Sequence, residues 1–210
     1  MINVLVADDH PVVRLGIRQI VAQSQDIAVA AEAASGPEVL GAIRRIPLDL
    51  VLLDLTMPGA NGLDVLKELK RERPQVPVII LTMHSEDQFA IRALKAGAAG
   101  YLTKESAPNE LVGAIRKVAA GGRYISPWLA EKLAERLGPE SEKPAHERLS
   151  DREYQVLRMI ATGKSTRSIS TELSLSVKTV GTYRARVLEK MNMKSTAELA
   201  AYVVRNRLAD

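Results

Sequence analysis

Five polar residues stand at the ends of short apolar runs in the first half of the chain. They are Asp8, Asp9, Asp54, Thr82 and Lys104. If those runs are parallel strands, their carboxyl ends meet at one edge of a sheet and bring the five side chains together. Three carboxylates so placed repel one another unless a cation joins them, and Mg²⁺ prefers such hard oxygen ligands. One carboxylate could then carry a phosphoryl group covalently, with Mg²⁺ and Lys104 neutralising its charge.

Each of these residues also has a simpler interpretation when it is taken alone. Asp9 could cap a helix that starts at Pro11, Thr82 could be an ordinary strand residue, and Lys104 could be solvated. Asp54 is harder to explain in structural terms, because an unpaired charge at the end of an apolar strand is costly. The coincidence of all of them at one edge favours a phosphoryl-accepting site.

The elements that must position these residues alternate along residues 1–121. The strand candidates are apolar throughout, which is typical of a parallel sheet covered by helices on both faces. We therefore predict an α/β domain with a doubly wound, five-stranded parallel sheet. The predicted strands are residues 2–7, 27–31, 48–53, 78–82 and 99–102, and the predicted helices are 11–23, 36–45, 63–71, 87–96 and 108–120.

The remainder of the chain carries no strand signal. Residues 122–148 are a predicted linker with a short helix that opens at Ser126 and Pro127, and residues 138–144 have linker composition. A small all-α domain with four helices is predicted at 149–210, where Ser150 and Glu153 form a capping box. Those helices are residues 151–161, 166–173, 177–191 and 195–207.

Positive charge is concentrated in this last segment. Residues 149–210 hold 11 Lys/Arg and 6 Asp/Glu, whereas residues 1–121 hold 13 and 14. Such a concentration indicates contact with a polyanion. Two short helices joined by a tight turn at 174–176, the second rich in hydroxyls and cations, predict a helix-turn-helix that binds double-stranded DNA. The alternative is an amphipathic bundle with a solvated basic face.

Composition excludes several other classes of protein. The chain has no cysteine, which removes disulfides, thiolate metal sites and thiol nucleophiles and fits a reducing cytosol. No apolar run approaches the roughly 18 residues that would span a membrane, and no leader is evident. We expect a cytoplasmic protein without a membrane partner. The three histidines have no metal-ligand spacing; His10 and His84 could flank the carboxylates, but we interpret both, with His146, as solvated loop residues.

Four segments make residues 2–120 resemble a receiver domain of two-component response regulators. They are VLVADDH at 4–10, LDLTMPG at 53–59, LT at 81–82 and YLTK at 101–104. The resemblance implies the flavodoxin-like strand order 2-1-3-4-5, with Asp54 as the phosphoacceptor assisted by Lys104 and Thr82. It implies Mg²⁺ held by Asp9, Asp54 and the Thr56 carbonyl, with Asp8 acting through water. Thr82 and Tyr101 would be the switch pair, the ring turning inward on phosphorylation. Glu105 directly follows Lys104, at a position where many receivers have proline.

Residues 149–206 are similar to the DNA-binding domain of NarL/LuxR-type regulators. The similarity lies in LSDRE at 149–153, VL at 156–157, IATG at 160–163, KTV at 178–180 and TYRAR at 182–186. Ser168, Ser170 and Gly181 depart from the family pattern, and Gly181 stands where some relatives carry a base-contacting lysine. The resemblance implies dimer contacts at Leu199, Tyr202 and Val203. The DNA-contact candidates are Lys164, Lys178, Thr179, Gly181, Thr182, Tyr183, Arg184 and Arg186.

Together these features predict a response regulator that acts as a transcription factor and is not an enzyme. A sensor histidine kinase would phosphorylate Asp54, which would promote dimerisation and sequence-specific DNA binding. The expected partners are that kinase, DNA, a second copy of the chain and RNA polymerase. One alternative is a metal-dependent phosphatase or phosphotransferase that uses the same carboxylates. Another is a constitutive DNA-binding protein with a vestigial pocket.

Overall fold

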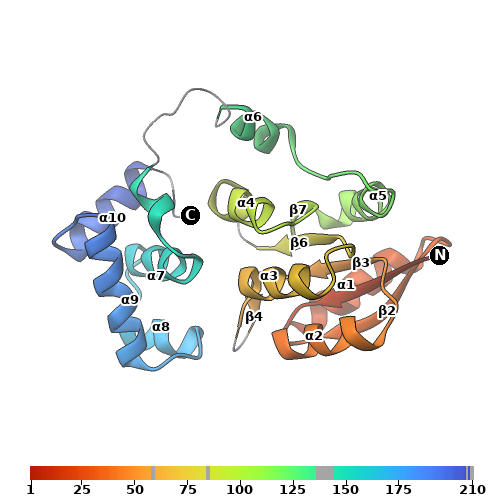
Figure 1. Ribbon diagram of the computed structural model, residues 1–210, viewed down its shortest axis with the longest axis horizontal. Helices are drawn as coiled ribbons and strands as arrows, with labels where there is room; N and C mark the ends of the chain where they lie inside the picture. Colours follow the sequence, from red (N-terminus) through yellow and green to blue (C-terminus); the bar gives the residue numbers. More distant parts are fainter. Residues whose placement is uncertain (58–59, 84–85, 136–143, 207, 209–210) are drawn as a thin grey trace. The chain divides into compact units, whose positions relative to one another are not determined.

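The computed structural model describes residues 1–57, 60–83, 86–135, 144–206 and 208. The chain folds into two compact units, Met1–Leu133 and Ala134–Asp210 (Figure 1). The boundary falls within α6 (Pro127–Glu135), whose first turn is capped by the Ser126 hydroxyl, which accepts a hydrogen bond from the Leu129 N–H. Within the described part of the chain, none of the helices combines the length and apolar character needed to cross a membrane.

The first unit contains a five-stranded parallel sheet. Its strand order is β2-β1-β3-β6-β7. Because β4 and β5 form a separate two-stranded sheet, β6 and β7 are the fourth and fifth strands of this one, and the order is the predicted 2-1-3-4-5. The polar residues of the predicted site lie at the carboxyl ends of three strands: Asp8 and Asp9 after β1, Asp54 after β3, and Thr82 at the end of β6. The strands are β1 (Ile2–Ala7), β2 (Ile27–Ala33), β3 (Leu50–Leu53), β6 (Val78–Thr82) and β7 (Gly100–Thr103).

Helices cover both faces of this sheet (Figure 1). Because successive strand residues point to opposite faces, Val4, Leu52 and Leu81 meet the apolar sides of α1 and α5. On α3, Leu63, Leu66 and Leu69 recur at helical spacing, and this apolar stripe is fully buried. The helices are α1 (Pro11–Ala22), α2 (Gly36–Arg45), α3 (Gly62–Glu72), α4 (Glu86–Lys95) and α5 (Ala107–Ala119).

A two-stranded hairpin that the sequence did not predict follows Asp54. It pairs β4 (Thr56–Met57) with β5 (Ala60–Asn61) in antiparallel fashion and leads directly into α3. Gly62 starts that helix, and a Cβ added to it would lie 2.5 Å from the carbonyl oxygen of Asp54. Only glycine therefore allows the chain to return this closely to the residue after β3.

The chain continues along the sheet after α5 ends. Gly121, with a φ of 87°, closes the helix close to its predicted end at residue 120. Tyr124 then lies beside β7, because its N–H donates to the Ala99 carbonyl at 3.0 Å and its carbonyl accepts from the Tyr101 N–H at 3.1 Å. The first residues of the expected linker thus pack as part of the first unit.

The second unit is helical and packs around a small apolar core. That core joins Val156 and Ile160 of one helix to Ile169 and to Val180 of two others. The predicted capping box is present, since the Glu153 N–H donates to Ser150 Oγ and the Ser150 N–H donates to the Glu153 carboxylate. The elements are the 3₁₀ helix η1 (Ala145–Arg148), α7 (Asp151–Ala161), α8 (Thr166–Glu172), α9 (Val177–Lys190) and α10 (Thr196–Arg205).

The helix-turn-helix turn has the predicted form. Ser174 adopts a positive φ of 53°, and the Ser176 hydroxyl caps α9 by accepting from the Thr179 N–H at 3.0 Å. The helical spacing predicts that Val177, Val180 and Val187 point inward from α9. The structure confirms this at Val180 and Val187, but Val177 is 52% exposed. Val177 occupies the first turn, away from the stripe that Val180 and Val187 share.

Candidate phosphoryl-accepting site and nucleic-acid interface

Two acidic residues and a lysine form a nearly closed cluster at the carboxyl edge of the sheet. Lys104 Nζ lies 2.6 Å from Asp8 Oδ2 and 2.7 Å from Asp54 Oδ2, and the side chains of Lys104, Asp8 and Asp54 are only 9%, 2% and 3% exposed. Backbone hydrogen bonds hold their positions: the Asp54 N–H donates to the Ala7 carbonyl, and the Lys104 N–H donates to that of Thr82. The predicted convergence of these residues at one edge is therefore what the fold produces.

The electrostatics of this cluster follow from burial and pairing. Burial raises the pKa of Asp54 above its usual value, and the Lys104 ammonium only partly offsets that effect. Burial opposes the charge of Lys104 as well, but its hydrogen bonds and ion pairs with Asp54 and Asp8 hold the lysine pKa above its usual value. Lys104 is thus a fixed cation beside a carboxylate that burial has made more basic.

The same edge also fits a divalent cation. Ligand atoms of Asp8, Asp9, His10 and Asp54 all lie within 4.8 Å of one another. Asp9 Oδ1 is buried without a hydrogen-bond partner, because His10 Nδ1, although 2.7 Å away, lacks hydrogen-bond geometry toward it. A buried carboxylate oxygen of this kind needs a positive partner, and Mg²⁺ is a suitable one. The Thr56 N–H donates to Asp54 Oδ1 at 3.3 Å, which brings that loop to the site.

The histidines differ in their surroundings. The side chain of His10 is 64% exposed, but its Nδ1 also lies 3.3 Å from Asp8 Oδ1, so this residue flanks the carboxylates. His84 lies outside the described residues. The prediction was wrong for His146: it is half-buried, its Nδ1 forms a 2.9 Å hydrogen bond with the Tyr202 hydroxyl, and its ring contacts those of Tyr154 and Tyr202.

Both members of the expected switch pair are buried. Thr82 ends β6, Tyr101 lies on the neighbouring β7, and each side chain is fully enclosed. The ring of Tyr101 is therefore already inside in this structure, whereas the sequence led us to expect that it turns inward only on phosphorylation. All peptide bonds of the described residues are trans, including the one that joins Lys104 to Glu105.

Arg14, which no sequence pattern singled out, supports the site from α1. Its Nη1 donates to the Asp8 carbonyl at 2.6 Å, and its Nε donates to Glu32 at 3.0 Å. Arg14 is six residues from Asp8 and Glu32 lies on β2, so only the tertiary fold brings the three together. By contrast, the sequence already indicated that His10 could flank the carboxylates, because it directly follows Asp8 and Asp9.

Most of the DNA-contact candidates lie on the exposed side of α9. Lys178, Gly181, Thr182 and Arg186 lie on this helix, and a Cβ at Gly181 would meet nothing within 4 Å. Tyr183 is half-buried and packs against the apolar core of the unit. This side of the helix is thus open and basic.

Besides Thr182, whose hydroxyl donates to the Lys178 carbonyl at 3.1 Å, three candidates already have partners within the second unit. Arg184 Nη2 donates to the Thr196 hydroxyl at 2.9 Å, and Lys164 pairs with Glu172 at 2.6 Å. The Thr179 hydroxyl shares a 2.7 Å hydrogen bond with the cap residue Ser176. Of the cationic candidates, Lys178 and Arg186 extend from the helix without such a contact among the described residues.

The expected dimer contacts on α10 need correction. Leu199 and Val203 are fully buried inside the second unit, because this side of the helix packs against α7. Tyr202 is half-buried and bonded to His146. Val204, which is 71% exposed, is a large apolar residue on the outer surface of α10. Helical periodicity identified the apolar side of α10 but could not show that the domain's own core uses it.

Comparisons with known proteins agree with both halves of this description. Residues 4–116 match the response regulator receiver domain, and residues 147–203 match the LuxR family of bacterial regulatory proteins. The chain is 43% identical to the response regulator GacA of Pseudomonas aeruginosa, with 100% of this chain and 99% of that protein covered. It is 40% identical to the response regulator UvrY of Escherichia coli K12, with 100% and 97% covered.

Solved structures extend the likeness to a DNA complex. RcsB from Salmonella enterica serovar Typhimurium, bound to promoter rprA in the presence of phosphomimetic BeF₃⁻, is 28% identical with a TM-score of 0.67, covering 97% of this chain and 99% of that one. Fold and site thus define a response regulator with a receiver domain and a helix-turn-helix domain. The chain belongs to the NarL/LuxR family of response regulators, which are transcription regulators.

Proposed function

We propose that Asp54 accepts a phosphoryl group from a sensor histidine kinase. A carboxylate oxygen of Asp54 would attack the phosphorus of a phosphohistidine, and the nitrogen–phosphorus bond would break as the imidazole leaves. The observation that carries this proposal is the buried ion pair between Asp54 and Lys104, which keeps a nucleophilic carboxylate beside a fixed cation. Lys104 would then neutralise the arriving phosphoryl oxygens, and the Thr82 hydroxyl would bind one of them.

The proposed Mg²⁺ ligands are Asp9, Asp54 and the Thr56 carbonyl, with Asp8 acting through a water molecule. The buried Asp9 oxygen without a hydrogen-bond partner supports this assignment. When bound, the ion supplies charge neutralisation that one ammonium cannot provide against three carboxylates and a phosphoryl group. Lys104, for its part, prevents Asp8 and Asp54 from repelling each other before the phosphoryl group arrives.

The output of the switch would be sequence-specific binding of double-stranded DNA. In this proposal residues 1–121 receive the signal, residues 122–148 link the domains, and residues 149–210 bind DNA in the cytoplasm, with RNA polymerase as a further partner. Lys178 and Arg186 would contact phosphates, while Thr182 and Arg184 would reach base edges from the exposed side of α9. Arg184 must first leave its hydrogen bond with Thr196.

Dimerisation would couple the two events. One helix-turn-helix reads only a short half-site, so pairing two of them is the usual way to gain specificity. We infer that Val204 of α10, and not Leu199 or Val203, forms the apolar part of that contact. Sedimentation of the beryllofluoride-treated protein should show a dimer that Val204→Asp weakens. A treated wild-type protein that stays monomeric both free and on DNA would contradict this part of the proposal.

Labelling with acetyl phosphate tests the phosphoacceptor. In the presence of Mg²⁺, intact-mass measurement should show one added phosphoryl group on the wild-type protein and none on Asp54→Asn. Asp64→Asn is the matched control, because Asp64 is an exposed carboxylate on α3, and it should be labelled like the wild type. Labelling of Asp54→Asn at the wild-type rate would overturn the assignment, and repeated release of phosphate in many turnovers would point to a phosphatase.

A further inference from the structure

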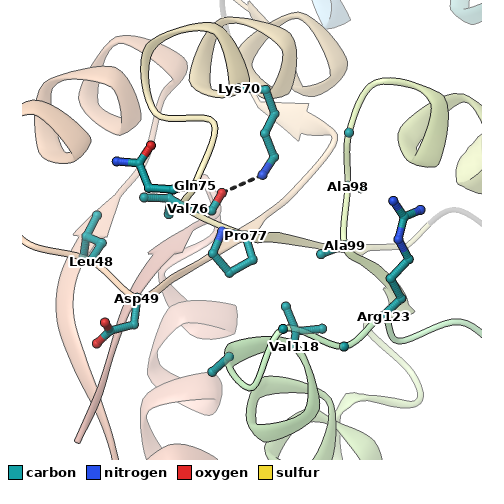
Figure 2. A pocket seen from close by; sticks show the side chains of 14 residues that line it. Leu48, Asp49, Lys70, Gln75, Val76, Pro77, Ala98, Ala99, Val118 and Arg123 are labelled. Carbon is teal, nitrogen blue, oxygen red and sulfur yellow. Dashed lines mark hydrogen bonds between the residues drawn. The ribbon is translucent and has the colours of Figure 1, made fainter.

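A second pocket, of about 480 Å³, lies at the opposite edge of the sheet from Asp54. Leu48 and Asp49 precede β3, Pro77 precedes β6 and Ala99 precedes β7, so the pocket lies where these strands begin (Figure 2). Its remaining walls come from Lys70 of α3, from the segments that follow α3 and α4, and from the residues at and after the end of α5. The phosphorylation chemistry uses none of these residues, although the volume is within the range of small-molecule sites.

Two cations, Lys70 and Arg123, stand at this pocket. Lys70 Nζ donates to the Val76 carbonyl at 2.7 Å (Figure 2). It also donates to the Pro74 carbonyl at 3.4 Å. Among the described residues, no carboxylate pairs with Lys70 or with Arg123. Burial lowers the pKa of Lys70, and the positive charge of Arg123 lowers it further, so the two cations repel each other across the pocket. An anion between them would remove that repulsion.

The rest of the lining has a different chemistry. Val118, Pro77 and Ala99 supply apolar surface between the cations and Asp49, which lies across the pocket from Arg123 in Figure 2. Asp49 Oδ2 accepts a hydrogen bond from the Asn3 N–H at 2.8 Å, and its other oxygen can accept from a ligand. The pocket is therefore positive at one end, apolar in the middle and acidic at the other end.

We propose that this pocket binds a small organic anion whose carboxylate or phosphate group lies between Lys70 and Arg123. The planar guanidinium of Arg123 can hold either group through two parallel hydrogen bonds, and the ammonium of Lys70 adds a third donor. A short carbon body would contact Val118 and Pro77, and a hydroxyl or amino group would donate to Asp49. Arg123 directly precedes the residue that pairs with β7, so such a ligand would contact the receiver where the chain leaves α5 for α6.

Nuclear magnetic resonance titration of the full-length protein tests this proposal. The probes are glycerol 3-phosphate, succinate and uncharged glycerol, and the reporters are the amides of the lining residues Gly97, Gly121 and Gly122. We expect saturable shifts of these amides with at least one of the two anions, which identifies the preferred group, and none with glycerol.

Variants separate the pocket from general binding of anions to a basic protein. Arg123→Gln should weaken binding about tenfold or more, as expected for the loss of a charge-assisted hydrogen bond. Arg73→Gln is the matched control, because Arg73 is exposed and does not line the pocket, and it should bind like the wild type. The proposal is wrong if no lining glycine shows a saturable shift, or if the two variants weaken binding equally.

Discussion

Replacing Lys104 with methionine would remove the cation from the phosphoryl-accepting cluster while keeping a side chain of similar length. In the wild-type protein the ammonium lies 2.6 Å from Asp8 and 2.7 Å from Asp54, and both carboxylates are almost completely buried. The variant would leave these two negative charges near each other without a positive partner. Burial already raises the pKa of Asp54, and loss of the ammonium would raise it further.

The expected cost is large because the pair is buried. Breaking a buried ion pair by removing one partner costs about 3–5 kcal/mol, whereas an exposed pair contributes at most about 1 kcal/mol. Lys67→Met is the matched control, since Lys67 is 54% exposed and its ammonium is 3.9 Å from Asp64. Mg²⁺ should restore more stability to Lys104→Met than it adds to the wild type, because it supplies the missing cation. An ion at a hundredfold excess over its Kd stabilises the folded protein by about 2.7 kcal/mol.

Hydrogen exchange of the buried β3 amides measures this effect in the first unit alone, within the full-length protein. We expect the free energy of opening to fall by about 3–5 kcal/mol in Lys104→Met at about pH 7 without Mg²⁺ and to change by less than about 1 kcal/mol in Lys67→Met. If Lys104→Met were as stable as the control, or if Mg²⁺ stabilised it no more than the wild type, the ion-pair reasoning would be refuted.

Two further predictions concern the second unit. Arg186→Ala should reduce the slope of log K against log salt for DNA binding by about one unit, because one phosphate contact is lost. Arg205→Ala on α10 is the control and should leave the slope unchanged. Equal slopes for both variants would mean that the exposed side of α9 does not face the DNA. Burial of Glu153 opposes its charge, but the Lys190 ammonium and hydrogen bonds at the helix cap hold its pKa below the usual value. The stabilisation is present above about pH 4.3 and is lost as pH falls through the lower folded-state pKa. The hydrogen-exchange protection of the α7 amides, taken relative to their intrinsic exchange rates at each pH, should therefore fall in acid in the wild type and much less in Glu153→Gln.

Sequence reasoning predicted the sheet and the site because both depend on local patterns. Apolar runs marked the strands, and their polar ends marked the edge at which Asp8, Asp54 and Lys104 meet. The capping box of α7 and the cap of α9 were equally local, since each depends on residues three positions apart.

Most of the failures depended on tertiary contacts. Periodicity marks an apolar stripe but does not say whether the domain or a partner covers it, which is why Leu199 and Val203 were misassigned. No pattern in the sequence connects His146 to Tyr202, because the two residues are far apart in the chain. The hairpin after Asp54 was missed because its two-residue strands are too short to show a period.

The central claim is that phosphorylation of Asp54 controls DNA binding. Its most direct test uses a DNA duplex that the acetyl-phosphate-treated protein selects from random sequences. The Kd of the full-length protein for this duplex is then measured with and without acetyl phosphate and Mg²⁺. Treatment should tighten binding by the wild type about 5–150-fold, as expected for a coupling of about 1–3 kcal/mol, and should leave Asp54→Asn unchanged. Equal tightening of Asp54→Asn, or no tightening of a wild-type protein that intact mass shows to be phosphorylated, would contradict the account.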